Sequence, residues 1–214
     1  MSVSRTRLKP ISPKDDRDLQ AELAAASKAT QTELAQAERA AQAAFSVEQR
    51  SLDKAEQRFA IARNAAVGLL GRLGDLDAVI PYLPSLRKGS LATGETVNVI
   101  ASRAEFARQS SNAFRGALRT DLLLITDAEV VARYRALANL SYELANSPSL
   151  GLALADGRAI GDVQNYAKYV VYSLNQFIDD KPLLDHAAPP ILLRDLKDGG
   201  SWLPDTVPVD WDKI

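Results

Sequence analysis

The sequence contains no cysteine and only one histidine among its 214 residues. Without cysteine there is no disulfide framework and no thiolate nucleophile, and one histidine cannot form a histidine cluster. Helical di-metal centres need Glu-x-x-His pairs from two helices, so they are excluded. We name no catalytic residue, no metal ligand and no cofactor from this composition.

A strong charge of either sign is also missing, because the formal net charge is −1 and the pI is about 5.9. No global positive field therefore gathers nucleic acid or anionic membrane. Unbroken apolar runs are only a handful of residues long, against the roughly 20 that a membrane-spanning helix needs. We interpret residues 1–14 as a flexible basic N-terminus that lacks the apolar run of a signal peptide. The chain is expected to be a cytoplasmic protein.

Helix breakers are absent from the fifty-four residues between Pro13 and Gly68. The side chains in this stretch are mostly Ala, Gln, Glu, Leu, Arg and Lys, which are strong helix formers. The sequence predicts a long, coiled-coil-like helix over residues 15–74, with the glycines at 68, 71 and 74 marking its end. Two arrangements stay open: one helix of about 80 Å, or a hairpin that kinks near Ser46.

This helix carries an apolar seam, in which steps of three and four residues connect sixteen positions, fourteen of them apolar and six of them alanine. A period of 3.5 to 3.6 residues is typical of a helix that lies along another helix. Small residues allow close approach but bury little area, so the pairing should be modest in strength. We expect a long helical partner, in the same chain or in another. The seam consists of Leu19, Leu23, Ala26, Thr30, Leu34, Ala37, Ala41, Phe45, Glu48, Leu52, Ala55, Phe59, Ala62, Ala66, Leu69 and Leu73.

Charged side chains along the same helix argue against membrane binding. Residues 15–70 hold nine acidic and seven basic side chains, which are interspersed in the sequence. A long helix that binds anionic lipid needs a basic face. We interpret the helix as lacking such a face, and we do not expect a membrane partner.

Helical patterns continue beyond the prolines at 81 and 84, and they predict a bundle of about three further helices over residues 76–178. The second helix should run to about Leu122. Thr126 and Glu129 have capping-box spacing and should open the third helix, which ends at Pro148. The fourth helix has an apolar face made of Val163, Tyr166, Val170, Leu174 and Phe177.

The composition changes at residue 179 to proline, aspartate and both tryptophans, and no periodicity survives. We predict that residues 179–214 form an extended arm. Since no convincing strand pattern is present, the predicted fold class is all-α: a long N-terminal Ala-rich helix, a helical bundle and an extended C-terminal arm. The acidic stretch that holds Asp179, Asp180, Asp185 and His186 matches no metal loop, and we interpret it as a solvated helix exit.

A local cluster of arginines is the first candidate site. Arg108, Arg115 and Arg119 fall within about 20° of one line on a regular helix. Residues 85–119 hold six basic side chains against two acidic ones, so this stripe is a candidate surface for an anionic partner. No aromatic side chain interleaves for base stacking, so a plain solvated face is the favoured interpretation and nucleic acid is not an expected partner.

Tyrosines provide the second candidate site. Tyr166 and Tyr169 lie three residues apart on the predicted fourth helix, and with Tyr134 they could line a ligand pocket between helices three and four. Tyrosines placed in this way more often pack their rings in the core. Trp202 and Trp211 form a third candidate, as anchors that dock the arm into a groove on this chain or on a partner.

More than fifty residues of the sequence belong to a helix with an apolar seam, and very few side chains are chemically reactive. We therefore expect a non-enzymatic scaffold or interaction protein that self-associates through the long helix, or that binds another helical protein. The alternatives are a small-ligand sensor that uses the tyrosines and a nucleic-acid-binding protein that uses the arginine stripe. Carboxylates and tyrosines suffice for some chemistry, but no constellation here indicates a reaction.

Overall fold

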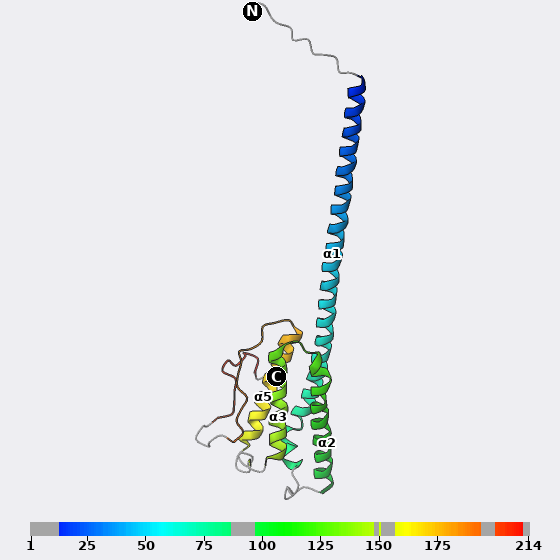
Figure 1. Cartoon of the computed structure of the whole chain (residues 1–214). Coiled ribbons are helices and arrows are strands. Elements are labelled where there is room, and N and C mark those ends of the chain that lie inside the picture. Colours follow the sequence, from blue (N-terminus) through cyan, green and yellow to red (C-terminus); the bar gives the residue numbers. More distant parts are fainter. Residues whose placement is uncertain (1–12, 87–96, 148–149, 151–156, 194–199, 212–214) are drawn as a thin grey trace, which may run out of the picture. The chain divides into compact units, whose positions relative to one another are not determined.

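The structure is a computed structural model, and it describes residues 13–86, 97–147, 150, 157–193 and 200–211. These residues form four α-helices (Figure 1): α1 (Pro13–Asp77), α2 (Val97–Gly116), α3 (Ala128–Asn146) and α5 (Arg158–Ile178). Three short 3-10 helices accompany them: η1 (Ile80–Leu86), η2 (Ala117–Arg119) and η3 (Asp121–Leu124). No residue in these ranges lies in a strand, which confirms the all-α prediction. Most of the predicted N-terminal segment, 1–14, lies outside the described residues.

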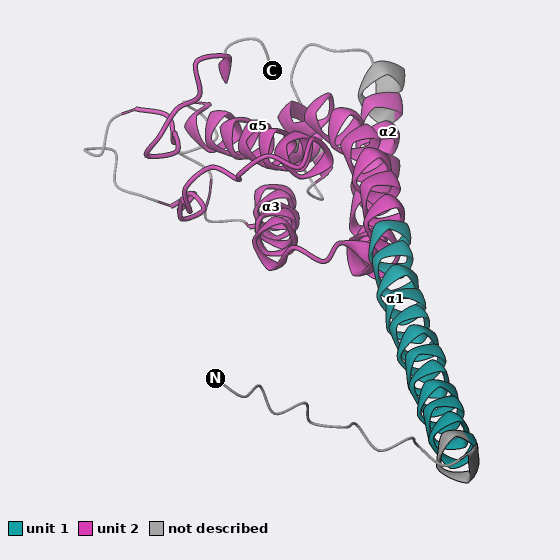
Figure 2. Cartoon of the chain, turned by 90° about the horizontal axis from the view of Figure 1, so that it is seen from above, with its two compact units in different colours: residues 1–57 teal, residues 58–214 magenta. Residues whose placement is uncertain are grey.

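The chain divides into two compact units, residues 1–57 and residues 58–214, which Figure 2 shows in different colours. Unit 1 contributes the α1 residues up to Gln57, and unit 2 contains the rest of α1 and all the other described elements. The boundary therefore lies within α1, whereas the sequence pattern placed the end of the long helix and the start of the bundle at 74–76. The last five turns of α1 belong to the core of unit 2.

Helix α1 is one helix through Ser46, so the hairpin alternative is wrong. Its first residue is Pro13, whose fixed φ and missing N–H suit the first position of a helix. The glycines at 68, 71 and 74 lie inside the helix, which ends at Asp77 rather than at residue 74. Glycine costs only about 1 kcal/mol in a helix, and the buried leucines around these glycines offset that cost.

The core of unit 2 is built on the second part of the seam. Ala62, Ala66 and Leu69 are fully buried, and the ring of Phe59 lies 6.0 Å from the ring of Phe177 on α5. Helices α3 and α5 lie side by side, and η1 packs against α2, α3 and α5 (Figure 1). The predicted apolar face of the fourth helix is buried on α5 as expected.

Helix α2 ends at Gly116, not near Leu122, because the chain tightens into η2 and leaves helical geometry at Thr120, where φ is −124° and ψ is −86°. Ala117 and Leu122 are both buried. On a regular helix, five residues correspond to a rotation of about 140°, which would put these two side chains on different faces. The break at Thr120 lets both enter the core.

The N-cap of α3 is Asp127, so the predicted capping role of Thr126 is wrong. One carboxylate oxygen of Asp127 accepts hydrogen bonds from the backbone N–H groups of Glu129 (2.9 Å) and Val130 (3.0 Å). Aspartate is a strong cap because its charge also favours the positive end of the helix dipole. The Glu129 side chain turns instead toward Arg133 and His186.

The glycines of unit 2 provide a direct test of the helix energetics. A Cβ atom added at Gly71 would meet no heavy atom within 4 Å. We expect Gly71→Ala to raise the free energy of unfolding by about 1 kcal/mol, because alanine loses less backbone entropy in a helix. Urea denaturation followed by circular dichroism measures this change. Gly157 has φ of +73°, so Gly157→Ala is the matched control and should lower stability by about 1 kcal/mol.

Candidate interaction surface

The exposed part of the seam is an apolar stripe on the described part of unit 1. Five large seam side chains are between 58% and 64% exposed: Leu19, Leu23, Leu34, Phe45 and Leu52. In unit 2 the same seam is buried, since Ala66 and Leu69 are 0% exposed. One continuous helical pattern is thus used as core in unit 2 and left without a cover in unit 1. We call seam positions 19–52 the exposed seam.

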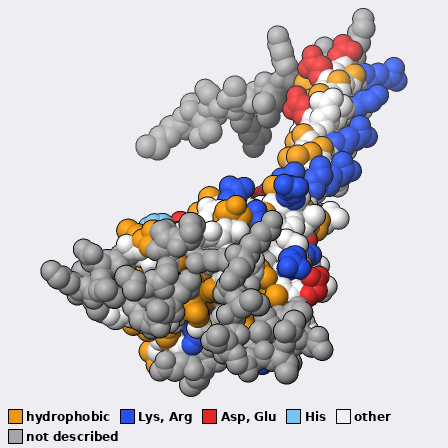
Figure 3. Space-filling view, turned by 90° about the horizontal axis from the view of Figure 1, so that it is seen from below, with side chains coloured by type: hydrophobic (Ala, Val, Ile, Leu, Met, Phe, Trp, Pro, Cys, Tyr) orange, Lys and Arg blue, Asp and Glu red, His pale blue; other side chains and the backbone are white. Residues whose placement is uncertain are grey.

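Unit 1 also has an internal repeat of eleven residues that the sequence analysis missed. The basic residues Arg17, Lys28, Arg39 and Arg50 follow one another at intervals of eleven. Eleven residues return to within about 20° of the same side of a helix, so these cations form one line. Figure 3 shows Lys and Arg side chains along one side of this helix and hydrophobic side chains along another.

This arrangement corrects the interpretation of the charges as merely interspersed. The basic line lies about 160° around the helix from the exposed seam, while Glu22, Glu33 and Glu38 lie at the edges of the seam. Steps of three and four residues describe only the apolar side, so they do not reveal this line. Comparison of successive eleven-residue blocks would have found it.

On unit 2, a buried arginine fastens the C-terminal arm to the bundle. Arg133 on α3 is 2% exposed. Its Nη2 donates to the carbonyl oxygen of Leu184 (2.7 Å), and its Nη1 donates to the hydroxyl of Ser173 (2.8 Å). The guanidinium also lies 4.4 Å from the ring centre of Tyr169. The sequence analysis missed this residue, because an arginine within a helix normally indicates a solvated face.

The three candidate tyrosines are buried, and their rings pack against different aromatic partners. Tyr134 stacks on Phe114 of α2, with ring centres 4.5 Å apart. The ring centres of Tyr166 and Tyr169 lie 5.7 Å apart, and both rings pack against Trp202 of the arm in T-shaped arrangements. Burial raises the pKa of each of these three phenols. Within the described residues, no group lies within hydrogen-bond distance of the Tyr134 hydroxyl.

The hydroxyl of Tyr169 serves the arm. It donates to the carbonyl oxygen of Asp185 (2.7 Å) and accepts from the backbone N–H of Ala187 (3.2 Å). These two hydrogen bonds hold the arm in place at Asp185 and Ala187. The arm belongs to no helix or sheet there, so its backbone groups need partners from other elements. The packing of these rings corresponds to the core interpretation of the tyrosines more closely than to a ligand wall.

Trp202 and Trp211 both lie against unit 2. The indole Nε1 of Trp202 donates to the carbonyl oxygen of Ala188 (3.0 Å), and its backbone N–H donates to the buried carboxylate of Asp162 (2.6 Å). Asn165 on α5 donates to the carbonyl oxygen of Trp202 (2.9 Å). Trp211 is 6% exposed. In this structure both tryptophans contact their own chain.

The arginine stripe is not a single line, because Arg119 lies in η2 beyond the end of α2. Arg108 forms an ion pair with Glu105, and the guanidinium of Arg115 lies 4.9 Å from the ring centre of Tyr142. Arg115 and Arg119 share the wall of a pocket of about 290 Å³ with Asn112, Gly116 and Leu118. Two of the three cations thus have partners on their own chain.

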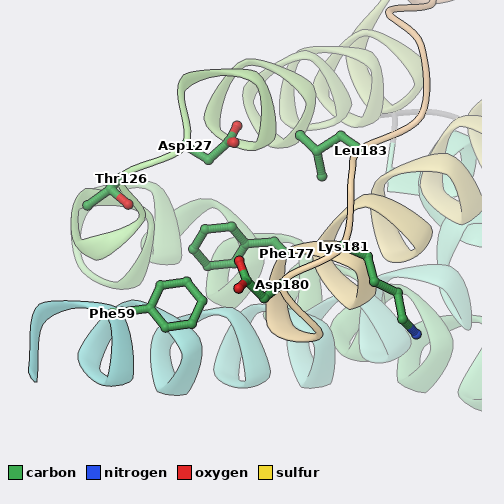
Figure 4. A pocket seen from close by; sticks show the side chains of 7 residues that line it. All are labelled: Phe59, Thr126, Asp127, Phe177, Asp180, Lys181 and Leu183. Carbon is green, nitrogen blue, oxygen red and sulfur yellow. The ribbon is translucent and has the colours of Figure 1, made fainter. Parts of the chain in front are cut away.

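Another pocket of about 290 Å³ lies where α1, the end of α5 and the start of the arm meet (Figure 4). Phe59, Phe177 and Leu183 supply its apolar wall. The Asp127 carboxylate in its rim is engaged in capping α3, and Lys181 binds Asp179 at 2.8 Å. These polar groups hold the corner together, and we assign no ligand to the pocket.

The described residues contain no group of three or more His, Asp or Glu side chains that could hold a metal ion. None of the helices in the described ranges combines the length and the apolar character needed to cross a bilayer. No protein family model matches the chain, and comparisons with curated proteins and with solved structures find no match.

Arg133 provides a test of how the arm is held. We expect Arg133→Lys to lower the free energy of unfolding by about 3 kcal/mol, because an ammonium cannot replace the bonds to Glu129, Ser173 and Leu184 and would leave buried acceptors unpaired. Urea denaturation measures the loss. Arg135→Lys, an exposed position on the same helix, should change little. Equal effects of the two substitutions would contradict the role of Arg133 in holding the arm on the bundle.

Glu129 gives a prediction for pH. The hydrogen bond from His186 and, after it, the bond and charge of Arg133 hold the pKa of Glu129 below its usual 4.5, although burial acts in the opposite direction. A depressed pKa means that the carboxylate stabilises the fold above pH 4.5 and that this contribution is lost as the pH falls through the folded value. Glu129→Gln should therefore flatten the acid dependence of the melting temperature between about pH 5 and pH 3.

The control for this pH experiment is Glu143→Gln, which removes one carboxyl group from the same helix. Its melting temperature should fall with acid as steeply as that of the unchanged protein. The same slope for Glu129→Gln would show that the link between Glu129, His186 and Arg133 contributes nothing to stability.

Proposed function

We propose that the protein is a non-enzymatic scaffold that self-associates through the exposed seam of unit 1. One observation carries this proposal: the seam that forms the core of unit 2 continues over residues 19–52 with its large apolar side chains more than half exposed. Soluble proteins rarely leave a continuous apolar stripe of this kind uncovered unless another molecule binds to it. The periodicity of the stripe fits a second helix.

The partition of charge around the helix favours a protein partner over a lipid surface. A helix that lies on anionic lipid needs cations beside its apolar face, where the headgroups are. Here glutamates flank the exposed seam, and the cations lie on the opposite side. When a second helix covers the seam, the basic line stays in water, so its charges keep their hydration. This line consists of Arg17, Lys28, Arg39 and Arg50.

The cytoplasm is the proposed compartment. A chain without cysteine gains nothing from oxidising surroundings. The buried tyrosines and the partnered arginines give weaker support to the sensor and nucleic-acid alternatives, because those side chains already have contacts within unit 2.

Substitution in the exposed seam tests self-association. We expect Leu34→Glu to separate the assembly into monomers, because burying one leucine is worth about 2 kcal/mol and each pair of chains loses two. A loss of about 4 kcal/mol raises the dissociation constant by roughly a thousandfold. Light scattering behind size-exclusion chromatography on the full chain gives the molar mass.

The matched control for Leu34→Glu is Val47→Glu. Val47 is 65% exposed, as Leu34 is 58% exposed, but it lies outside the seam, so its substitution should leave the assembly intact. A monomeric unchanged chain at all concentrations, or equal dissociation by both variants, would contradict the proposal.

A further inference from the structure

The positions of the exposed seam are symmetric about its middle. The seam residues pair off at equal distances from the point between residues 35 and 36: Leu19 with Leu52, Leu23 with Glu48, Ala26 with Phe45, Thr30 with Ala41, and Leu34 with Ala37. The α1 residues of unit 1, 13–57, have their midpoint at residue 35. A second copy of this helix that runs in the opposite direction therefore meets the first with every seam position opposite another.

We infer that two chains pair antiparallel through their exposed seams, with the twofold axis between residues 35 and 36 of each chain. This inference rests on the proposed self-association and specifies its partner, direction and register. A parallel pair in register would instead place each residue against its own copy. Side-chain size, the position of one glutamate and the charge at the helix ends distinguish the two arrangements.

Side-chain size favours the antiparallel pair. It places Phe45 opposite Ala26 and Leu34 opposite Ala37, so that the largest seam side chain and the central leucine each meet an alanine, while Leu19 meets Leu52 at the ends of the pair. A parallel pair would stack Phe45 on Phe45 and Ala41 on Ala41. The distance between the helices would then have to vary from layer to layer, and voids would remain beside the alanines.

Glu48 gives a second reason. It is the one charged residue among the seam positions. A parallel pair in register would bring two Glu48 carboxylates together in the seam, where repulsion and loss of hydration both disfavour them. The antiparallel pair sets Glu48 opposite Leu23, along which its methylene groups lie while the carboxylate reaches water at the edge.

The charge at the two ends of the helix gives a third reason. Residues 15–22 contain four acidic side chains and one basic side chain. Residues 49–56, which lie opposite them in the antiparallel register, contain two of each sign. A parallel pair would place two acidic ends side by side, and the antiparallel pair avoids this repulsion.

The length of the seam repeat determines how two paired helices wind around each other. From residue 19 to residue 52 the seam repeats every eleven residues, whereas from residue 52 to residue 73 it repeats every seven. An eleven-residue repeat gives a nearly straight pair with a slight right-handed twist, and a seven-residue repeat gives a left-handed one. The change at Leu52 therefore separates the part of α1 that pairs with the second chain from the part that packs in the core of unit 2.

Cysteine cross-linking tests the direction and register, because the chain contains no cysteine of its own. Full-length Thr30→Cys and Ala41→Cys variants, one of them lengthened by a tag, are mixed before refolding and then oxidised. In the antiparallel pair these two positions face each other, within the short Cα separation that a disulfide needs. In a parallel pair they are about 16 Å apart along the axis, and each can bond only to its own copy.

The expected result is a disulfide dimer formed almost entirely between the two different variants, with little product from either variant alone. Thr32→Cys mixed with Arg39→Cys, two positions at the same level of the antiparallel pair but on the side of the basic line, is the matched control and should give no dimer. Dimers of each variant with itself would overturn the antiparallel inference and leave self-association standing. Light scattering that finds only monomers would overturn both, and an assembly without any cross-link would overturn the seam as its interface.

Discussion

Burial of one apolar seam on α1 is the constraint on which the rest of the structure depends. In unit 2 the seam residues from Ala62 to Leu73 are small or unbranched at Cβ, and all are buried in the core to which α2, α3 and α5 also contribute. Their small size lets neighbouring helices come close. The core is therefore well packed although this part of the seam contains few large side chains. The same pattern in unit 1 creates the same need for cover, and the described residues of unit 1 contain nothing that supplies it.

A second set of interactions holds the irregular arm on unit 2. Arg133, Tyr169 and Asp162 are buried, and each bonds to a backbone group of the arm. An extended segment without a strand partner has unsatisfied N–H and C=O groups, which are costly when buried. Buried polar side chains from α3 and α5 meet that requirement and so determine where the arm lies.

The sequence predicts the regular part of this architecture well, because it depends on local periodicity. The seam, the apolar face of α5 and the absence of strands all follow from steps of three and four residues.

The sequence predicts the ends of helices poorly. Gly68 lies within α1 because packing outweighs propensity, and Asp127 rather than Thr126 caps α3 because either residue type can do so. Arg133 was not predictable, since its partners Ser173 and Leu184 are forty or more residues away.

Alanine in the seam and alanine elsewhere in unit 1 have different physical effects. Eleven of the twenty-five residues from 21 to 45 are alanine, and this keeps the helix formed without help from a core, because alanine has the highest helix propensity. In the seam, the same residue limits the area that a partner can cover, so each layer adds little free energy. A helix that is formed before binding loses less conformational entropy when it binds. In the proposed self-association, such a surface favours an assembly that forms quickly, needs its whole length to be stable, and responds to protein concentration.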